Sequence, residues 1–151
     1  MSRLLDTQEF LDTVCQMLAE GRTNVPVPVT GNSMVPFLHN GDMVFLSTPD
    51  SPLQKGDILL YQRSSGRYIL HRLYKICRDG SLVMVGDAQQ SLELLPSQDQ
   101  VRARVVSAVH KGKPCPPNSL RWWLYRHVWL WLRPFRHILM RLKGKLNALH
   151  R

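Results

Sequence analysis

Hydrophobic and polar positions follow two different periods along this chain. Between residues 10 and 18 the apolar residues recur at spacings of three and four, which is typical of one face of an α-helix. Asp6 with Glu9 resembles a capping box, and Gly21 is a suitable stop signal. The pattern therefore predicts an amphipathic helix over residues 5–21.

The middle of the chain has the punctuation of a β structure, with short apolar runs separated by turn residues. These runs are Met43–Leu46, Ile58–Tyr61, Tyr68–Ile76 and Leu82–Val85, and residues 101–105 alternate between apolar residues and arginine. Ser64–Gly66 and Asp79-Gly80 predict hairpin turns. Val25–Thr30 alternates β-branched residues with prolines, which fits an edge strand because proline cannot donate to a sheet ladder.

Three prolines in four residues make Lys113–Asn118 a predicted linker. Two helices are expected beyond it, Leu120–Leu132 and Phe135–Leu149, with Pro134 between them. The predicted organisation is an N-terminal helix (1–22), a β-rich domain (23–112) and a linker with a helical tail (113–151). The predicted fold class is α+β, mainly β.

Charge divides the chain in a similar way. The formal net charge is +9, but residues 100–151 hold 12 Lys and Arg and no acid, whereas residues 1–99 are net acidic. No apolar run reaches the roughly 18 residues of a membrane span. The four acids among the first 20 residues argue against a secretory signal, so we expect an N-terminus that neither crosses nor targets a membrane.

The cysteines predict neither a disulfide framework nor a metal site. There are three of them, with no C-x-x-C pair and no His pair at zinc spacing. We expect no metal and no cofactor.

Tryptophan and arginine alternate with leucine in the tail, as in helices that lie in a membrane interface. The candidate membrane contacts are Trp122, Trp123, Trp129, Trp131, Arg126 and Arg133. Two other interpretations stay open, a packed helical pair that covers the sheet and, less favoured, a nucleic-acid contact. The expected localisation is peripheral on a membrane, with its side left open.

The segment Gly31–Asp42 places one hydroxyl, that of Ser33, between a permissive glycine and the stiffening Pro36. Alone, such a serine more often caps a turn than performs chemistry. Three later blocks change this interpretation: Lys55–Tyr61, Tyr68–Leu73 and Val85–Asp87.

In this order the four blocks resemble the signal peptidase I family, in particular its archaeal and endoplasmic reticulum branch, where histidine replaces a lysine base. The resemblance implies a coiled antiparallel sheet of the signal peptidase and repressor-autoprotease type. It also implies that Ser33 is the nucleophile, His71 its general base and Asp87 an assisting acid. Attack on an amide needs a base within reach of the hydroxyl, and an acid beside the imidazole fixes its tautomer.

Other residues of these blocks have structural expectations. Asp42 and Asp57 follow glycines and are expected to form turns. Arg72 lies on the opposite strand face from His71 and is expected to make an ion pair or to pack its stem rather than to contact substrate. Met34 should be an apolar contact under the nucleophile turn.

Two positions depart from the family pattern. Gly31 stands where the family commonly has a hydroxyl of the oxyanion hole, which leaves the Ser33 backbone N–H, helped by Asn32 or Thr30, to stabilise the oxyanion. After Asp87 the family's further acid is missing, and Glu93 is the one candidate replacement.

The expected function is hydrolysis of a peptide or preprotein through an acyl-enzyme, with small side chains before the scissile bond. A secretory signal peptide and the leader of a modified peptide are equally suitable substrates. Self-cleavage is a second enzyme hypothesis, although the repressor proteases that do this use a lysine base. A binding module with a weak or inactive site, attached to membrane by its tail, is the non-enzyme alternative.

Overall fold

A computed structural model describes residues 2–135, 138 and 141–142 of the chain. A helix, α1 (Ser2–Ala19), precedes the strands β1 (Val25–Pro28), β2 (Met43–Ser47), β3 (Ile58–Gln62), β4 (Tyr68–Ile76), β5 (Leu82–Val85) and β6 (Glu93–Leu95). Then come the 3₁₀-helix η1 (Gln98–Gln100), β7 (Val101–His110), β8 (Lys113–Cys115), α2 (Leu120–Leu124), the π-helix η2 (Tyr125–Trp129) and the 3₁₀-helix η3 (Arg133–Phe135).

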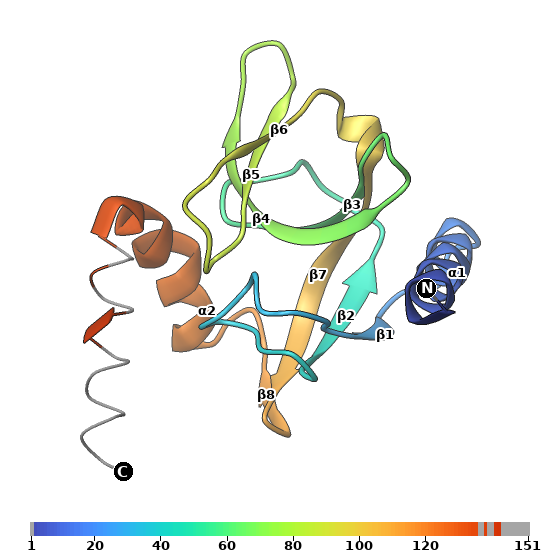
Figure 1. Cartoon of the computed structure of the whole chain (residues 1–151), viewed down its shortest axis with the longest axis horizontal. Helices are drawn as coiled ribbons and strands as arrows, with labels where there is room; N and C mark the ends of the chain where they lie inside the picture. The colour runs from blue at the N-terminus through green and yellow to red at the C-terminus, as the bar shows by residue number, and fades with distance from the viewer. Residues whose placement is uncertain (1, 136–137, 139–140, 143–151) are drawn as a thin grey trace.

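All the strands belong to one antiparallel sheet. Its order is β1-β2-β7-β3-β4-β5-β6, and β8 also pairs with β7. Register shifts at Phe45/Leu46, Leu60/Tyr61 and Leu73/Lys75 add local twist, so that the sheet curves back over itself (Figure 1). The expected fold class, α+β and mainly β with helices at both ends, is confirmed.

The long strands start and end close to the predicted positions. Both predicted hairpins are present, because Arg63 N–H donates to the Arg67 carbonyl and Cys77 N–H donates to the Ser81 carbonyl. The prediction of a linker over Lys113–Asn118 is wrong for its first half, which forms β8. Pro114 is tolerated there because β8 lies off the main path of the sheet and pairs only with β7 among the described strands.

The N-terminal helix begins at Ser2 rather than at the predicted residue 5 and ends at Ala19. Gly21 adopts a φ of 88°, and its N–H donates to the Leu18 carbonyl, which terminates the helix as expected. Helix α1 lies beside β1 and β2 (Figure 1). Its Asp12 accepts a 2.6 Å hydrogen bond from the Tyr68 hydroxyl of β4. This bond attaches the helix to a strand that is not adjacent to β1 or β2 in the sheet.

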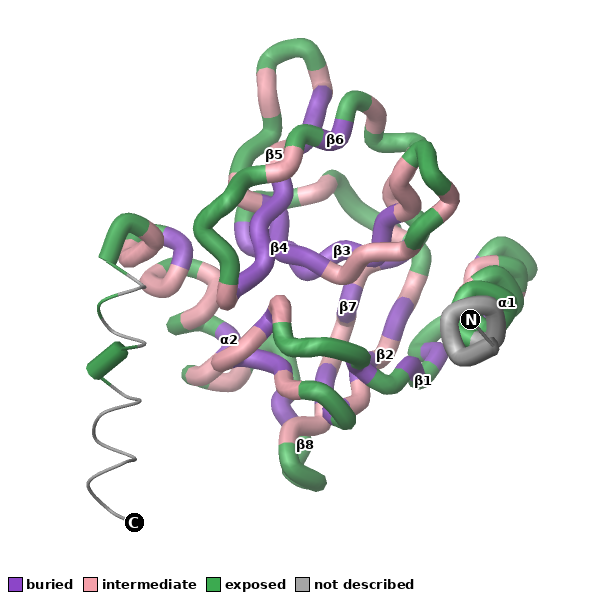
Figure 2. Tube along the Cα trace, viewed as in Figure 1, coloured by how far each residue is buried: buried purple, intermediate pink, exposed green. Residues whose placement is uncertain are grey.

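Two clusters of buried apolar residues stabilise the sheet. The larger contains side chains of α1, β1, β2, β7 and the loop after β1, together with Trp122 of α2. The smaller contains Leu59, Tyr61, Leu73, Leu82, Met84 and Leu95. Buried residues occur along β3, β4 and β5 and also on β1, β2 and β7, whereas most of the described side chains of α1 are exposed (Figure 2).

The tail begins as predicted at Leu120, capped by Ser119, whose hydroxyl accepts from the Trp122 N–H. Helical structure continues through the π-helix η2 and turns at Pro134 inside η3. Of the second predicted helix, Ile138, Arg141 and Leu142 are helical, and most of the rest lies outside the described residues. In the described part of the chain, no helix is both long and apolar enough to cross a bilayer.

Candidate active site

Ser33 lies in a loop between β1 and β2 that hydrogen bonds close at its base. Val29 N–H donates to the Asp42 carbonyl at 2.7 Å, and Gly41 N–H donates to the Val29 carbonyl at 2.8 Å. At the top of the loop Gly31 has a φ of 81°, a conformation that favours glycine, and its N–H donates to Oδ1 of Asn40. The loop thus presents Ser33 on a backbone fixed at both ends.

The turn after β5 supports the nucleophile from the other side. Ala88 N–H donates to the Ser33 carbonyl at 2.9 Å. A Cβ added to Gly86 would lie 2.7 Å from the same carbonyl oxygen, which is closer than real Cβ contacts. Gly86 is therefore required for the close approach of two backbone segments, and the Gly86-Asp87 turn holds the nucleophile in place.

His71 comes from the sheet. It lies in β4 opposite Leu59 of β3 and is almost fully buried. Ser33 and His71 both line a pocket of about 420 Å³, together with Gly31, Asn32 and Gln89. The fold therefore brings the predicted nucleophile and the predicted base, which come from separate parts of the chain, to one cavity.

A tyrosine orients the imidazole. The Tyr61 hydroxyl lies 3.3 Å from Nδ1 of His71 and donates to Oε2 of Glu93 at 2.7 Å. A phenol has a single proton, and here Glu93 accepts it, so Nδ1 must be the donor in the contact with Tyr61. This assigns the proton of neutral His71 to Nδ1 and leaves Nε2 as the basic nitrogen.

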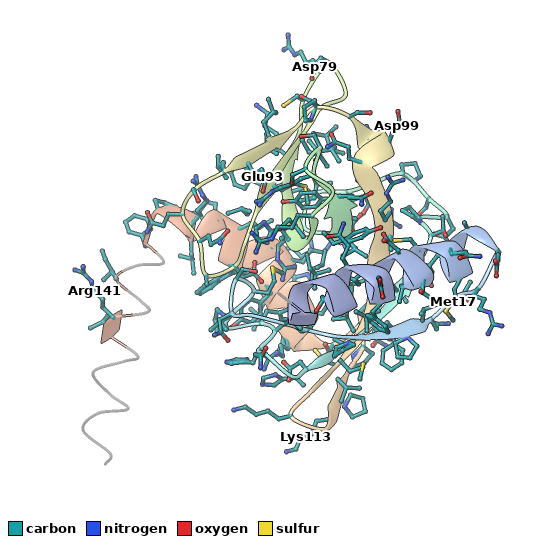
Figure 3. The ribbon with its side chains drawn as sticks, turned by 45° about the vertical axis from the view of Figure 1, so that its right-hand side comes forward. Met17, Asp79, Glu93, Asp99, Lys113 and Arg141 are labelled. Atoms are coloured by element: carbon teal, nitrogen blue, oxygen red, sulfur yellow. The ribbon has the colours of Figure 1, made fainter. Side chains whose placement is uncertain are left out.

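Glu93, at the start of β6 and labelled in Figure 3, is in turn bound by Arg63. The guanidinium donates from Nε at 2.6 Å and from a terminal nitrogen at 2.7 Å, a bidentate pair. These hydrogen bonds lower the pKa of Glu93 more than burial raises it. For the Tyr61 phenol, burial is the largest effect and raises the pKa. Glu93 is thus an anion and Tyr61 a neutral donor at neutral pH.

The charge state of His71 follows from its surroundings. Burial lowers its pKa below the usual 6.5, the charge of Glu93 raises it, Arg63 lowers it and Asp87 raises it. Because burial is the largest effect, the imidazole is neutral at neutral pH and can accept a proton. Glu93 is the acid that acts most strongly on it.

Asp87 has a different main partner. Both of its oxygens accept hydrogen bonds from Arg72, at 2.8 and 2.7 Å, in a pair with no exposed surface. Arg72 also donates to the Gly56 carbonyl and lies over the ring of Phe37. The expected ion pair of Arg72 is thus present, and it ties the turn after β5 to the strand that carries His71.

Met34 is buried in the larger core cluster beneath the nucleophile loop, as expected. Asn32 and Gly31 are exposed at the pocket, with nothing within 4 Å of the position of a Gly31 Cβ. The oxyanion hole expected from the sequence therefore has no side chain at position 31, and the two expected helpers, Asn32 and Thr30, both line the pocket with Ser33.

Asp42 and Asp57, the two other aspartates that follow glycines, stabilise turns as predicted. The side chain of each accepts a hydrogen bond from the backbone N–H three residues before it. Oδ2 of Asp57 accepts from the Gln54 N–H, and Oδ2 of Asp42 accepts from the His39 N–H, both at 2.8 Å. Asp57 also pairs with Arg104 and Arg126. These acids lie outside the Ser33–His71 pocket.

One cluster has side chains that could bind a metal, and the sequence analysis did not identify it. Single ligand atoms of His39, Asp42 and His110 lie within 4.8 Å of one another. Nδ1 of His110 is 2.6 Å from Oδ2 of Asp42, which also accepts the His39 N–H, and Oδ1 accepts from Lys111 N–H at 3.2 Å. Burial raises the pKa of Asp42, but these hydrogen bonds outweigh it and hold the pKa below its usual value.

The roles of Tyr61 and Arg63 were not predicted from the sequence, and Glu93 was named only as a replacement acid. The sequence feature that could have revealed Tyr61 is the hairpin turn at Ser64–Gly66, because this turn sets the register of β3 and β4. In that register Leu59 is opposite His71, so Tyr61, two residues along the same face, is its diagonal neighbour.

Four of the six residues expected to contact a membrane make contacts within the protein. Trp122 is 4% exposed, and the Trp129 indole donates to the Asp87 carbonyl at 3.1 Å. Arg126 pairs with Asp57 at 3.0 Å, and Arg133 donates to the Gln90 carbonyl. Trp123 and Trp131 are exposed.

The sequence profile of the Peptidase S24-like family matches residues 3–106, which include α1, the nucleophile loop, His71 and the Gly86-Asp87 turn. This family covers repressor autoproteases as well as signal peptidase-like serine peptidases. No curated protein and no solved structure matches the chain. The match spans most of the chain and all of the candidate site, and the chain therefore belongs to the Peptidase S24-like family of serine peptidases.

Proposed function

We propose that this protein is a serine endopeptidase in which Ser33 is the nucleophile and His71 the general base. The observation that carries the proposal is the shared pocket: two side chains from distant segments meet at one cavity, and one of them is a buried imidazole held in a defined tautomer.

The chemistry is that of acyl transfer. Nε2 of His71 takes the proton from the Ser33 hydroxyl as its oxygen attacks the scissile carbonyl, and the imidazolium then gives this proton to the leaving amine. Tyr61 keeps Nδ1–H in place, and the negative charge of Glu93 stabilises the imidazolium. Water, activated by the same imidazole, hydrolyses the acyl-enzyme.

Turnover should be slow in comparison with peptidases that have a complete oxyanion hole. Gly31 supplies no side-chain donor, and loss of one donor costs about two to three powers of ten in rate. The Ser33 N–H, with the Asn32 amide beside it, is left to stabilise the negative oxygen. A slow, specialised processing enzyme is consistent with this arrangement.

The proposed substrates are signal or leader peptides with small residues before the scissile bond. This finer assignment is supported by the sequence blocks around Ser33, His71 and Asp87, which resemble signal peptidase I. The pocket also suits an extended peptide, because Val27, Val29 and Leu70 offer apolar contacts and Asn32, Arg67 and Gln89 offer polar ones.

Self-cleavage is a second candidate, favoured by membership of a family that covers repressor autoproteases. Intact-mass measurement of the purified protein during long incubation distinguishes it. Autoproteolysis gives two fragments at a rate that does not depend on protein concentration, whereas the proposed peptidase leaves its own chain intact and cleaves added peptide.

The decisive experiment is cleavage of Ala-x-Ala peptides in detergent by wild type, Ser33→Ala and His71→Ala, with Ser65→Ala in the exposed hairpin as a matched control. We expect at least a thousandfold loss in the first two variants and no change in the control. Wild-type rates in both site variants would contradict the proposal, and a wild type that cleaves neither peptide nor itself would favour a binding module. Comparison of processed peptides in cells with wild type or Ser33→Ala would identify the natural substrate.

A further inference from the structure

The tail is apolar on two faces, of which the protein covers one. Trp122 and Leu130 are buried against the domain, with Trp122 edge-on to Phe37 of the nucleophile loop at 5.3 Å between ring centroids. A second set of large apolar side chains is exposed, and we call it the tail stripe. Its members are Leu120, Trp123, Leu124, Trp131, Phe135, Ile138 and Leu142.

The exposure of the tail stripe is not marginal. Leu120 is 71% exposed and Trp131 is 75% exposed. Six of its seven members recur in the sequence at spacings of three, four or seven residues, and the set extends across the π-helix η2 and the turn at Pro134. Soluble domains rarely expose so many large apolar side chains within one short segment unless the segment binds something.

Charge indicates what the tail stripe binds. The tail, residues 119–151, contains eight basic residues and no acid. Three arginines of the tail bind the protein itself, through backbone carbonyls or Asp57: Arg121, Arg126 and Arg133. Arg141, in contrast, is exposed between Ile138 and Leu142 and lies away from the sheet (Figure 3). A second copy of the chain would bring two strongly basic tails together, which like-charge repulsion disfavours.

We propose that the tail stripe inserts into the interface of an anionic lipid bilayer. Tryptophan rings prefer the headgroup boundary, leucine and isoleucine enter the acyl region, and the exposed Arg141 is attracted to anionic lipid. The attachment lies in the plane of the interface and requires no membrane-spanning helix.

The same segment is fixed to the rim of the active site. The Trp129 indole donates to the Asp87 carbonyl and Arg133 to that of Gln90, in the loop whose Gln89 lines the pocket with Ser33. Binding of the tail stripe would therefore hold the pocket near the bilayer surface. Only this consequence, access to membrane-bound peptide, rests on the proposed peptidase function.

The test uses the full chain and point variants, because deletion of the tail would remove Trp122 and Leu130 from the core. Flotation is measured with vesicles of phosphatidylcholine alone and with 30% phosphatidylglycerol. We expect wild type to float with the anionic vesicles, less so in high salt, and the Leu120→Ser/Trp131→Ser double variant to lose at least tenfold in partitioning. The control is Ile76→Ser/Leu94→Ser, two exposed apolar residues of β4 and β6, which should float like wild type.

Equal flotation of the tail-stripe variant and wild type, or no flotation of either, would overturn the proposal. A wild-type dimer in light scattering that the double variant abolishes, without flotation, would instead assign the tail stripe to a second copy. Cleavage of a soluble Ala-x-Ala peptide should be the same in all these proteins, so a failed membrane test and a failed peptidase assay are separate results.

Discussion

The Tyr61 hydroxyl oxygen lies 3.3 Å from Nδ1 of His71, on the neighbouring strand of the sheet. In serine peptidases with an acid beside the histidine, a carboxylate accepts this N–H directly. Here a neutral phenol accepts it and passes the hydrogen bond on to Glu93. The acid assists the imidazole across one intervening side chain, which keeps a carboxylate out of the buried position next to Nδ1.

Replacement of Tyr61 with phenylalanine should lower kcat/KM by roughly ten- to a hundredfold, because Nδ1–H loses its acceptor and the imidazole can adopt the unproductive tautomer. KM for an Ala-x-Ala peptide should change little, since the hydroxyl does not line the pocket. Tyr74→Phe, on the same strand as His71, is the matched control and should retain wild-type activity. An unchanged rate in Tyr61→Phe would remove Tyr61 from the mechanism.

The pH dependence of kcat/KM reports the pKa of His71 in the free enzyme. Burial lowers that pKa, so activity should rise with a midpoint below 6.5 and reach a plateau by neutral pH. Glu93 raises the pKa of His71 and Arg63 lowers it, so Glu93→Gln should move the midpoint to still lower pH while the plateau rate falls. A midpoint well above 7 would indicate a different base.

The same lowered pKa affects stability. In the unfolded chain His71 binds a proton near pH 6.5, whereas in the folded chain it does so only at lower pH. The stability that neutral His71 contributes to the folded chain is therefore complete above pH 6.5 and is lost as pH falls below that value. Urea unfolding at pH 7.5 and pH 5 should show this loss, and His71→Ala should reduce the difference.

Asp87→Asn tests whether this acid positions the site through Arg72. The change leaves the Arg72 guanidinium buried without its charge partner, and breaking a buried pair costs about 3–5 kcal/mol. We expect that loss in urea unfolding, with a reduced kcat and only a small shift of the pH midpoint to lower pH, because Asp87 has the smallest of the four effects on the pKa of His71. The double variant Arg72→Met/Asp87→Leu should recover much of the stability. A large shift of the pH midpoint with intact stability would instead place Asp87 in direct support of His71.

Gly86→Ala should reduce activity more than its effect on folding would suggest. The new methyl group would lie 2.7 Å from the Ser33 carbonyl oxygen and must push the nucleophile loop away from the turn after β5. Displacements of about 1 Å at a catalytic group can cost a hundredfold in rate. Parallel measurements of kcat and of unfolding free energy would show this, and a variant that is fully active would mean that the loop can shift without consequence.

Much of the architecture was predictable because it depends on local patterns. Alternating apolar runs located the strands from β2 to β5, and two glycine-containing turns located the β3–β4 and β4–β5 hairpins. Gly21 marked the end of α1. β6 and β8 were not predicted, because three residues are too few to show a period and Pro114 normally argues against a strand. Ser33 and His71 were named from sequence motifs.

Which groups assist His71 was decided by the tertiary structure. Asp87 has the more suggestive motif, but the curvature of the sheet places its carboxylate on the Arg72 guanidinium, whereas β6 brings Glu93 to Tyr61. The tail shows the same division: its composition predicts an amphipathic helix, and only packing against Phe37 decides that Trp122 is buried while Trp131 is exposed. Local periodicity determines which element a residue joins, but the partner of a side chain depends on contacts between elements that are distant in the chain.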